Sequence, residues 1–544
     1  MGVPPQAIVI AYRTSQGGKP GKPGEPGILG DSSVRGMKAM TQATAAKTTA
    51  SAQTTTSTPA NIALAIDAAT ATATVADPAA TVPVMPASDA SAAPVSASAA
   101  PVATVPAAST PATTVPAFAA PASTVPAVTV PASAAHATTI PTALAPATTA
   151  TAQDITANIA DRVRGIPANP FAAANARVAD YRAAGHDIID LSQGNPDGKP
   201  PQFMIDALAE AAQDPADFKY PAFSGKPAFL KAAAGWYRRE FGVILDPATQ
   251  LLATAGASVG ISVVIQTLVN AGDLVVLVGP YYPQYEGSTA VVQGRIYTIA
   301  TSPERGFLPD LDAVPQEIWD QAKLLILNYP NNPTGAVATP GLFETAVRIG
   351  KEHHVVIVND FAYAGIGYDA QPPISLLSTP GALDVSLELC SLSKMYMIAG
   401  WRGGFVAGNA QLMTAVKSVH AQTSLLVSSI VQDAGAAGLN SDQSTVRALA
   451  NRYHRRYLAL RDGLAEAGLH LTDSHGGLFA WMPVPNGDDQ AFARWLIDKA
   501  GVAVIPGSDF GPTGAGYVRF SLLMPEETLA QAAHRIRDAR GDAW

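Results

Sequence analysis

A lysine and an arginine stand eight residues apart in the segment 388–405, ELCSLSKMYMIAGWRGGF. The run 387–392 predicts a strand, and Lys394 follows at its end, within largely apolar sequence. Burial destabilises an ammonium group, so it favours the neutral amine, which is the form that attacks a carbonyl carbon. Arg402, within Gly-Trp-Arg-Gly, offers a planar fork of donors that suits a phosphate. Taken alone, the pair is explained as well by a lysine that reaches solvent and a surface arginine.

A carboxylate follows the apolar run 355–358, in the sequence VVIVNDFAY. At the end of a buried strand, Asp360 would need a cationic partner. A protonated pyridine nitrogen is such a partner, and the pair would make the ring an electron sink. Tyr363, three residues later, could reach a hydroxyl group on the same ring. The alternative is that Asp360 only caps a helix.

Three further motifs could bind a ligand, and two of them follow predicted strands, where ligands gather in an open parallel sheet. The turn NYPNNPTG at 328–335 comes after the apolar run 323–327 and contains Asn332. The segment LLATAGASVG at 251–260 precedes an apolar helix predicted at 261–269, and its small residues would leave free backbone N–H groups for a phosphate. Tyr282, in GPYYP, could stack on a flat ring. Each motif alone is also compatible with an ordinary turn or a packed tyrosine.

Two motifs near the ends of the globular part complete the set. LSQGNP at 191–196 predicts a tight turn around Gly194. YVRFS at 517–521 alternates as a strand does and contains Arg519, whose guanidinium could bind a substrate carboxylate. A surface arginine on a strand is the alternative.

The elements that must position these residues alternate along the chain from about residue 155. Helices are predicted at 203–213, 228–241 and 340–353, and buried strands at 274–278, 323–327 and 355–358. Strands that alternate with helices imply an α/β domain with a mostly parallel sheet. A length of about 390 residues suits one such domain and a smaller α+β partner.

The first 154 residues differ in composition from the rest. They are rich in Ala, Thr, Pro, Ser and Val, and Thr-Val-Pro recurs five times. Frequent proline and scarce aromatic residues predict a disordered extension. It could serve as a tether, or it could be dispensable, with a true start nearer Met37 or Met40.

Overall composition excludes several classes of protein. The net charge of −8 argues against a nucleic-acid surface, and no apolar run is long enough for a membrane span. Cys390 is the one cysteine, so no disulfide framework is possible and a reducing cytoplasm is expected. His353, His354 and Cys390 carry no site signal, and no metal site is predicted.

Together, in this order and at this spacing, the motifs give the segment from about 160 to 540 a clear family likeness. It resembles the class I and II aminotransferases, which are fold-type I enzymes dependent on pyridoxal 5′-phosphate (PLP). The resemblance implies a large domain with a mostly parallel, seven-stranded sheet and a smaller α+β domain. It places the aminotransferase domain at 155–540, with the large part at about 202–430 and the small part at about 155–201 and 431–544.

The resemblance also implies roles for the residues above. Lys394 would be the catalytic residue and would bind the cofactor as a Schiff base, while Asp360 would pair with the ring nitrogen. The other cofactor contacts would be Ala257, Ser258, Ser391 and Arg402 at the phosphate, Tyr282 on the ring face, and Asn332 and Tyr363 at the ring hydroxyl.

Substrate and subunit contacts are implied in the same way. Arg519 would bind the α-carboxylate, with help from Asn332 and Gly194. Tyr220, in KYPAFSGKPAF, matches a tyrosine that reaches the phosphate of a neighbouring subunit. This match implies a homodimer with shared active sites.

The expected activity is transamination between an L-amino acid and a 2-oxo acid by a ping-pong mechanism through Lys394. The motifs are most similar to bacterial aminotransferases of the methionine-salvage and LL-diaminopimelate type. Met395, Met397 and Gly403 depart from the usual residues beside the lysine, so the substrate stays open. The alternatives are a PLP-dependent carbon–sulfur β-lyase and a non-catalytic PLP-binding regulator.

Overall fold

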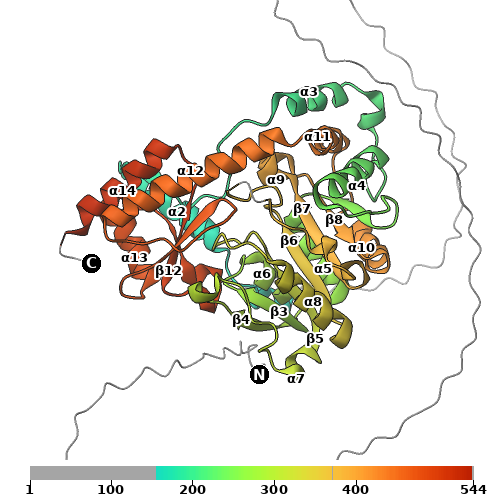
Figure 1. Ribbon diagram of the computed structural model, residues 1–544, viewed down its shortest axis with the longest axis horizontal. Helices are drawn as coiled ribbons and strands as arrows, with labels where there is room; N and C mark the ends of the chain where they lie inside the picture. The colour runs from blue at the N-terminus through green and yellow to red at the C-terminus, as the bar shows by residue number, and fades with distance from the viewer. Residues whose placement is uncertain (1–154, 370–371, 542–544) are drawn as a thin grey trace, which may run out of the picture. The chain divides into compact units, whose positions relative to one another are not determined.

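The computed structural model of the chain describes residues 155–369 and 372–541 (Figure 1). The extension predicted at residues 1–154 lies outside the described residues.

A seven-stranded sheet forms the centre of the larger part. From one edge to the other its strands are β2 (Leu251–Thr254), β8 (Gly404–Gly408), β7 (Ser386–Ser391), β6 (Val356–Phe361), β5 (Ala322–Leu327), β3 (Leu274–Gly279) and β4 (Arg295–Ala300). Strand β8 runs antiparallel to both of its neighbours, and the other adjacent pairs are parallel. The prediction of a mostly parallel sheet is therefore confirmed.

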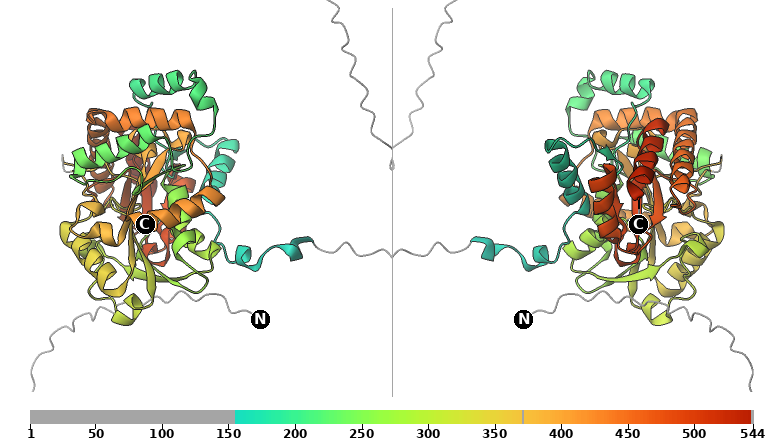
Figure 2. Two further views of the ribbon diagram at one scale, coloured as in Figure 1. Left: turned by 90° about the vertical axis from the view of Figure 1, so that its right-hand side faces the viewer. Right: turned by 90° about the vertical axis from the view of Figure 1, so that its left-hand side faces the viewer.

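Helices cover both faces of this sheet (Figures 1 and 2). On one face, α5 (Ala257–Leu268), α6 (Gln284–Val291) and α10 (Ala410–Thr423) share a core with alternate strand residues such as Val275 and Leu277. On the other face, Val276 packs with α8 (Pro340–His353), and Leu251 packs with α4 (Pro227–Phe241). Successive strand residues thus enter opposite cores, which explains why these strands read as continuous apolar runs.

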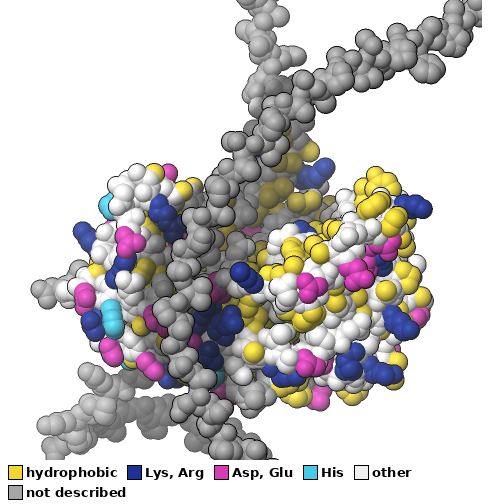
Figure 3. Space-filling view, turned by 90° about the horizontal axis from the view of Figure 1, so that it is seen from above, with side chains coloured by type: hydrophobic (Ala, Val, Ile, Leu, Met, Phe, Trp, Pro, Cys, Tyr) yellow, Lys and Arg dark blue, Asp and Glu magenta, His cyan; other side chains and the backbone are white. Residues whose placement is uncertain are grey.

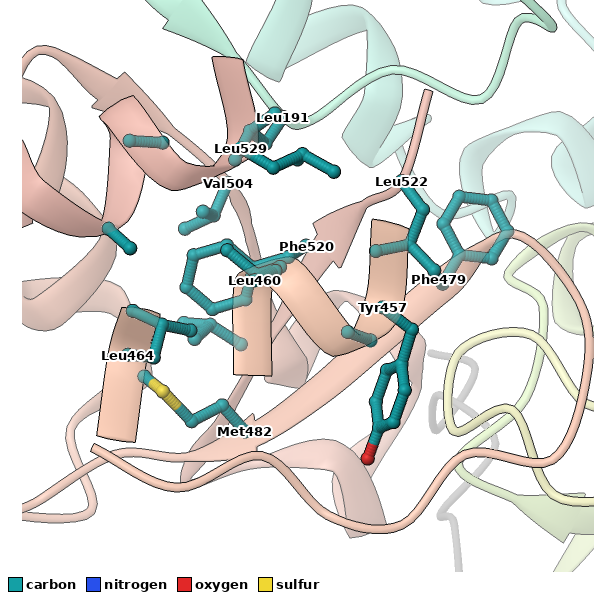
Figure 4. Packing of buried hydrophobic residues seen from close by; sticks show 14 of the residues in the cluster. Leu191, Tyr457, Leu460, Leu464, Phe479, Met482, Val504, Phe520, Leu522 and Leu529 are labelled. Atoms are coloured by element: carbon teal, nitrogen blue, oxygen red, sulfur yellow. The ribbon is translucent and has the colours of Figure 1, made fainter. Parts of the chain in front are cut away.

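A smaller α+β part is built from both ends of the described chain. Its strands are β9 (Phe479–Pro483), β12 (Tyr517–Ser521) and β11 (Ile505–Pro506), which form an antiparallel sheet, and β1 (Ile189–Asp190) and β10 (Val502–Ala503), which form a parallel pair. The long helices α12 (Ser444–Glu466) and α14 (Glu526–Arg540) pack on them. Figure 4 shows the shared core, where Leu460 and Leu464 of α12 meet Phe520 of β12 and Met482 of β9.

Seven further α-helices lie among the described residues. They are α1 (Asp161–Arg164), α2 (Pro170–Ala183), α3 (Gln202–Ala211), α7 (Gln316–Trp319), α9 (Leu392–Met395), α11 (Ser429–Asn440) and α13 (Asp489–Trp495). Helix α8 has the predicted bounds, and the predicted helices 203–213 and 228–241 match α3 and α4 within two residues at each end. Among the described residues, no helix combines the length and the apolar character that crossing a bilayer requires.

Candidate active site

A cavity of about 330 Å³ lies where the carboxyl ends of the central strands face β12 and the turn after β1. Its lining includes every residue predicted for the site except Tyr220. These residues are Gly194, Ala257, Ser258, Tyr282, Asn332, Asp360, Tyr363, Ser391, Lys394, Arg402 and Arg519. Residues that are more than 300 positions apart in the sequence are thus brought to one cavity, and His353, His354 and Cys390 do not line it.

Lys394 lies in a one-turn helix rather than at the end of a strand. Strand β7 ends at Ser391, one residue earlier than predicted, and the Ser391 hydroxyl accepts a hydrogen bond from the Ser393 N–H and so starts α9. The Lys394 amine donates to the Gly194 carbonyl oxygen. Burial, with the nearby charges of Arg519 and Arg402, lowers the pKa of Lys394 to about 8. About a tenth of the amine is therefore neutral at pH 7, which makes it a competent nucleophile or base.

Asp360 is a buried carboxylate in β6, at the end nearest the cavity. One oxygen accepts a hydrogen bond from the Tyr285 hydroxyl at 2.7 Å, and the other accepts one from the Ala362 N–H at 3.2 Å. Burial raises the pKa of Asp360 to about 6. Among the described residues no lysine, arginine or histidine forms an ion pair with it. A cation bound in the cavity would therefore find a ready partner here.

The turn after β5 joins Asp360 to the opposite wall of the cavity. Asn328 donates from its side chain to the Asp360 backbone carbonyl at 2.7 Å and accepts the Asn332 N–H at 2.9 Å. The side-chain oxygen of Asn332 then accepts a hydrogen bond from Arg519 at 3.1 Å. Because each link is buried, the turn fixes the position of Arg519 relative to the sheet.

Arg519 is fully buried in β12, so the alternative of a surface arginine is wrong. Its guanidinium also donates to the Ser192 carbonyl at 2.8 Å, while its Nε has no hydrogen-bond partner among the described residues. Burial lowers the pKa of Arg519 to about 10. A buried guanidinium with donor capacity left over is suited to a carboxylate ligand.

Three aromatic rings hold this guanidinium in place. Its Cζ atom lies 4.0 Å from the ring centroid of Phe479, 5.0 Å from that of Phe510 and 5.3 Å from that of Phe171. Phe171, at the start of α2, also stacks on Tyr282 with ring centroids 5.9 Å apart. The charge is therefore stabilised by ring faces where water is excluded.

The start of α5 lines the cavity on the side of Arg402. The helix begins at Ala257, four residues earlier than predicted, after Gly256, which has a positive φ of 88°. A side-chain Cβ at Gly256 would lie 2.9 Å from the guanidinium of Arg402, so glycine allows this close approach. Arg402 in turn donates to the carbonyl oxygens of Ala255 and Ala399, each at 2.9 Å. Free N–H groups of α5 and a fixed guanidinium together favour a phosphate.

Tyr220 stands apart from this group, with 92% of its surface exposed. Phe218 and Phe223 in the same loop are also exposed, at 72% and 59%. The loop is anchored by Lys226, whose amine lies 2.5 Å from a carboxylate oxygen of both Asp217 and Asp433. Figure 3 looks onto the face that carries α3 and α11, where apolar side chains are exposed among charged ones.

Several residues of the cavity carried no prediction. Tyr285 follows Tyr282 by three residues, a spacing that places two side chains on one side of a helix start, so it could have been found. Phe171, Ser192 and Phe479 gave no such signal, because only tertiary packing brings them to Arg519.

Comparisons with known proteins are consistent with this geometry. Residues 186–536 match the family described as aminotransferase class I and II. The L-glutamine–4-(methylsulfanyl)-2-oxobutanoate aminotransferase of Bacillus subtilis is 40% identical over 375 residues, which are 69% of this chain and 94% of that protein. An LL-diaminopimelate aminotransferase of Desulforudis audaxviator is 38% identical over 383 residues, 70% of this chain and 98% of that protein. The solved structure of substrate-bound BacF from Bacillus subtilis covers 69% of this chain and 96% of its own, with a TM-score of 0.67 and 32% identity.

Proposed function

The chain belongs to the class I and II aminotransferases, and we propose that it transfers amino groups between L-amino acids and 2-oxo acids whose side chains carry no net charge. It is a PLP-dependent transaminase, as its family and named relatives show. One observation carries the proposal for its site: the amine of Lys394, the carboxylate of Asp360 and the guanidinium of Arg519 all face one cavity.

The residues of this cavity fit PLP. Asp360 is a buried carboxylate that has no cationic partner among the described residues. A protonated ring nitrogen would be such a partner. Arg402 and the start of α5 would bind the phosphate, and Gly256 leaves the space that the guanidinium of Arg402 needs. The ring of Tyr282 is available to stack on the cofactor.

We assign the remaining cofactor contacts by the same reasoning. Ser258 and Ser391 would donate to the phosphate, with the backbone at Ala257, and Asn332 and Tyr363 would bind the ring hydroxyl. Burial raises the pKa of Tyr363, so its hydroxyl keeps its proton and can act as a donor. When bound, PLP supplies an aldehyde that takes up an amino group and a ring that withdraws electrons from the substrate α-carbon.

The protein's own groups then divide the work of the reaction. Lys394 would hold the cofactor and, once the substrate amine has taken its place, its neutral amine would remove the proton from the substrate α-carbon. Arg519 would fix the substrate α-carboxylate, with Asn332 and the backbone at Gly194. Asp360 would keep the ring nitrogen protonated throughout.

The charges of the cavity support the proposed substrate class. Among its described lining residues the cations are Lys394, Arg402 and Arg519, and each already has a role. A second carboxylate on a substrate would therefore be buried without a partner. The similar enzyme from Bacillus subtilis is named for two substrates with uncharged side chains, glutamine and 4-(methylsulfanyl)-2-oxobutanoate.

We also propose a cytoplasmic homodimer in which Tyr220 of each subunit reaches the phosphate bound by the other. Tyr220 does not line the cavity of its own subunit. The neighbouring Phe218 and Phe223 are exposed and offer apolar surface that a second copy would cover. Within each subunit the proposed domain spans 155–540, with a large part at about 202–430 and a small part at about 155–201 and 431–544.

A screen of amino donors with purified, PLP-loaded protein tests the function. Glutamine or methionine with 4-(methylsulfanyl)-2-oxobutanoate or pyruvate should give kcat/KM values at least about tenfold above those of aspartate with 2-oxoglutarate, because an unpaired buried charge is disfavoured by more than about 1.4 kcal/mol. The products are followed by chromatography. Faster turnover of the dicarboxylate pair would refute the substrate class. Release of pyruvate and ammonia from cystathionine, with no 2-oxo acid added as co-substrate, would indicate a β-lyase instead.

A further inference from the structure

The hydroxyl of Tyr285 is the one side-chain group among the described residues that hydrogen-bonds to the carboxylate of Asp360, at 2.7 Å. Tyr285 lies in the first turn of α6 and only 2% of its surface is exposed. The Thr289 hydroxyl donates to its backbone carbonyl, and the Tyr282 ring packs edge-on against its ring at 5.8 Å. The phenol is therefore held in a fixed position behind the carboxylate.

A tyrosine hydroxyl acts on a carboxylate in a directional way. Burial raises the pKa of Tyr285 well above its usual range, so the phenol stays protonated and can donate to Asp360 at any ordinary pH. A donated hydrogen bond stabilises the ionised carboxylate more than the neutral acid. It also fixes one oxygen on the side of α6 and so limits the rotation of the carboxyl group.

We propose that Tyr285 is a positioning residue for transamination, which holds Asp360 ionised and oriented toward the nitrogen of the cofactor ring. The inference rests on the proposed role of Asp360. In the absence of this hydrogen bond, the buried carboxylate would take up a proton more readily, and a neutral acid could not pair with a protonated ring nitrogen.

Other ionisable groups interact electrostatically with Asp360 or line the same cavity. They are Tyr282 before α6, Tyr363 after β6, Cys390 of β7, Lys394 of α9, Arg402 after the helical turn Ala399–Trp401 and Arg519 of β12. None of them hydrogen-bonds to the carboxylate, whose second donor is the Ala362 N–H. Removal of the Tyr285 hydroxyl would therefore leave one backbone donor to stabilise the ionised form.

The chain provides a matched control on the other face of the sheet. Tyr237 of α4 is buried and donates to the carboxylate of Glu388 at 2.9 Å. Glu388 does not line the cavity. Tyr237→Phe and Tyr285→Phe thus remove the same group from the same kind of partner, and only the second change affects Asp360.

The test measures binding of PLP to the full-length protein between pH 4.5 and 8.5, by the absorbance of the bound cofactor. A hydrogen bond to a charged group contributes about a factor of ten or more, so Tyr285→Phe should raise the pH below which affinity falls by about one unit. Affinity at pH 6 should then drop about fivefold, with little change at pH 8, because the pKa of Asp360 would rise from about 6 by about one unit. Tyr237→Phe should change the affinity for PLP by less than about twofold at both pH values, because it acts on a carboxylate outside the cavity.

A second change of side chain probes the same hydrogen bond in the opposite direction. Replacement of Tyr285 by 3-fluorotyrosine keeps the shape of the ring and makes the hydroxyl a stronger donor. The acidic limb of PLP binding, which is the fall in affinity at low pH, should then move to lower pH. In an Asp360→Asn background, Tyr285→Phe should have no further effect on this limb.

An unchanged acidic limb in both Tyr285 variants, an equal shift in Tyr237→Phe, or a full shift in the Asp360→Asn background would each overturn the inference. Because binding is measured without any amino acid, protein that binds PLP but does not transaminate refutes the proposed reaction and leaves this test intact.

Discussion

Two buried carboxylates lie on neighbouring strands of the central sheet, and their surroundings differ. Glu388 of β7 accepts four hydrogen bonds, from the hydroxyls of Ser375 and Tyr237, the side-chain amide of Asn359 and the N–H of Leu376, at 2.5 to 2.9 Å. Asp360 of β6 accepts two, from Tyr285 and Ala362. The first carboxylate is saturated by the protein, whereas the second retains acceptor capacity toward a cavity.

The sheet register explains how the two can be so close and yet so different. Glu388 lies opposite Asn359 in the pairing of β6 with β7, and side chains alternate between the faces of a sheet. Glu388 therefore points toward α4, where the protein fills the space, while Asp360 points toward α6 and the cavity. Burial raises the pKa of both carboxyl groups, so burial alone does not identify the functional one. The unfilled acceptor capacity does.

The largest expected effect is at the amine that shares the cavity with Asp360. Lys394→Ala should reduce kcat/KM by about four orders of magnitude, because it removes both the attachment point of PLP and the base. Borohydride treatment should no longer fix the cofactor to the protein. Lys351→Ala, on the exposed Lys351–Asp384 ion pair, should leave activity unchanged. Near-normal activity of Lys394→Ala would refute its assignment.

The next largest effect distinguishes the two carboxylates directly. Asp360→Asn should lower kcat/KM by about a thousandfold, since the ring nitrogen would lose the charge that keeps it protonated. Steady-state kinetics on PLP-saturated protein measure this. Glu388→Gln is the control: it should change kcat/KM by less than about threefold, because Glu388 does not line the cavity. Equal losses of activity would break the comparison.

The smallest effect is on the stability of the protein without cofactor. Because the pKa of Asp360 is raised to about 6 in the folded protein, its carboxylate destabilises the fold above pH 6, and this effect disappears as the pH falls toward 3.8. Asp360→Asn should therefore raise the free energy of unfolding at pH 7 by up to about 3 kcal/mol, and by little at pH 4. Urea denaturation at the two pH values measures the difference.

The opposite sign in that experiment would be informative. If Asp360→Asn instead lowered the free energy of unfolding at pH 7, and lowered it more than at pH 4, the protein itself would satisfy the hydrogen-bonding needs of the Asp360 carboxylate. Its surroundings would then resemble those of Glu388, and the cavity would lose its need for a cation.

Much of this arrangement could be predicted from local sequence. Runs rich in Val, Ile and Leu identified β3, β5 and β6, and helical patterns identified α3, α4 and α8, because burial on a sheet or a helix face imposes those patterns. Polar residues directly after such runs pointed to the cavity, since parallel strands end at one edge. The bounds of β7 and α9 were less predictable, because a serine such as Ser391 can either continue a strand or accept a hydrogen bond with its hydroxyl and cap a helix.

Sequence alone thus determined which reactive groups stand within or soon after predicted strands: an amine at 394, a carboxylate at 360 and a guanidinium at 519. The tertiary structure decided what surrounds them. It placed three aromatic rings around Arg519 and gave Glu388 four donors but Asp360 only two. These contacts join segments far apart in the chain, and hydrogen-bond saturation depends on every neighbour in space, which no local pattern of residues records.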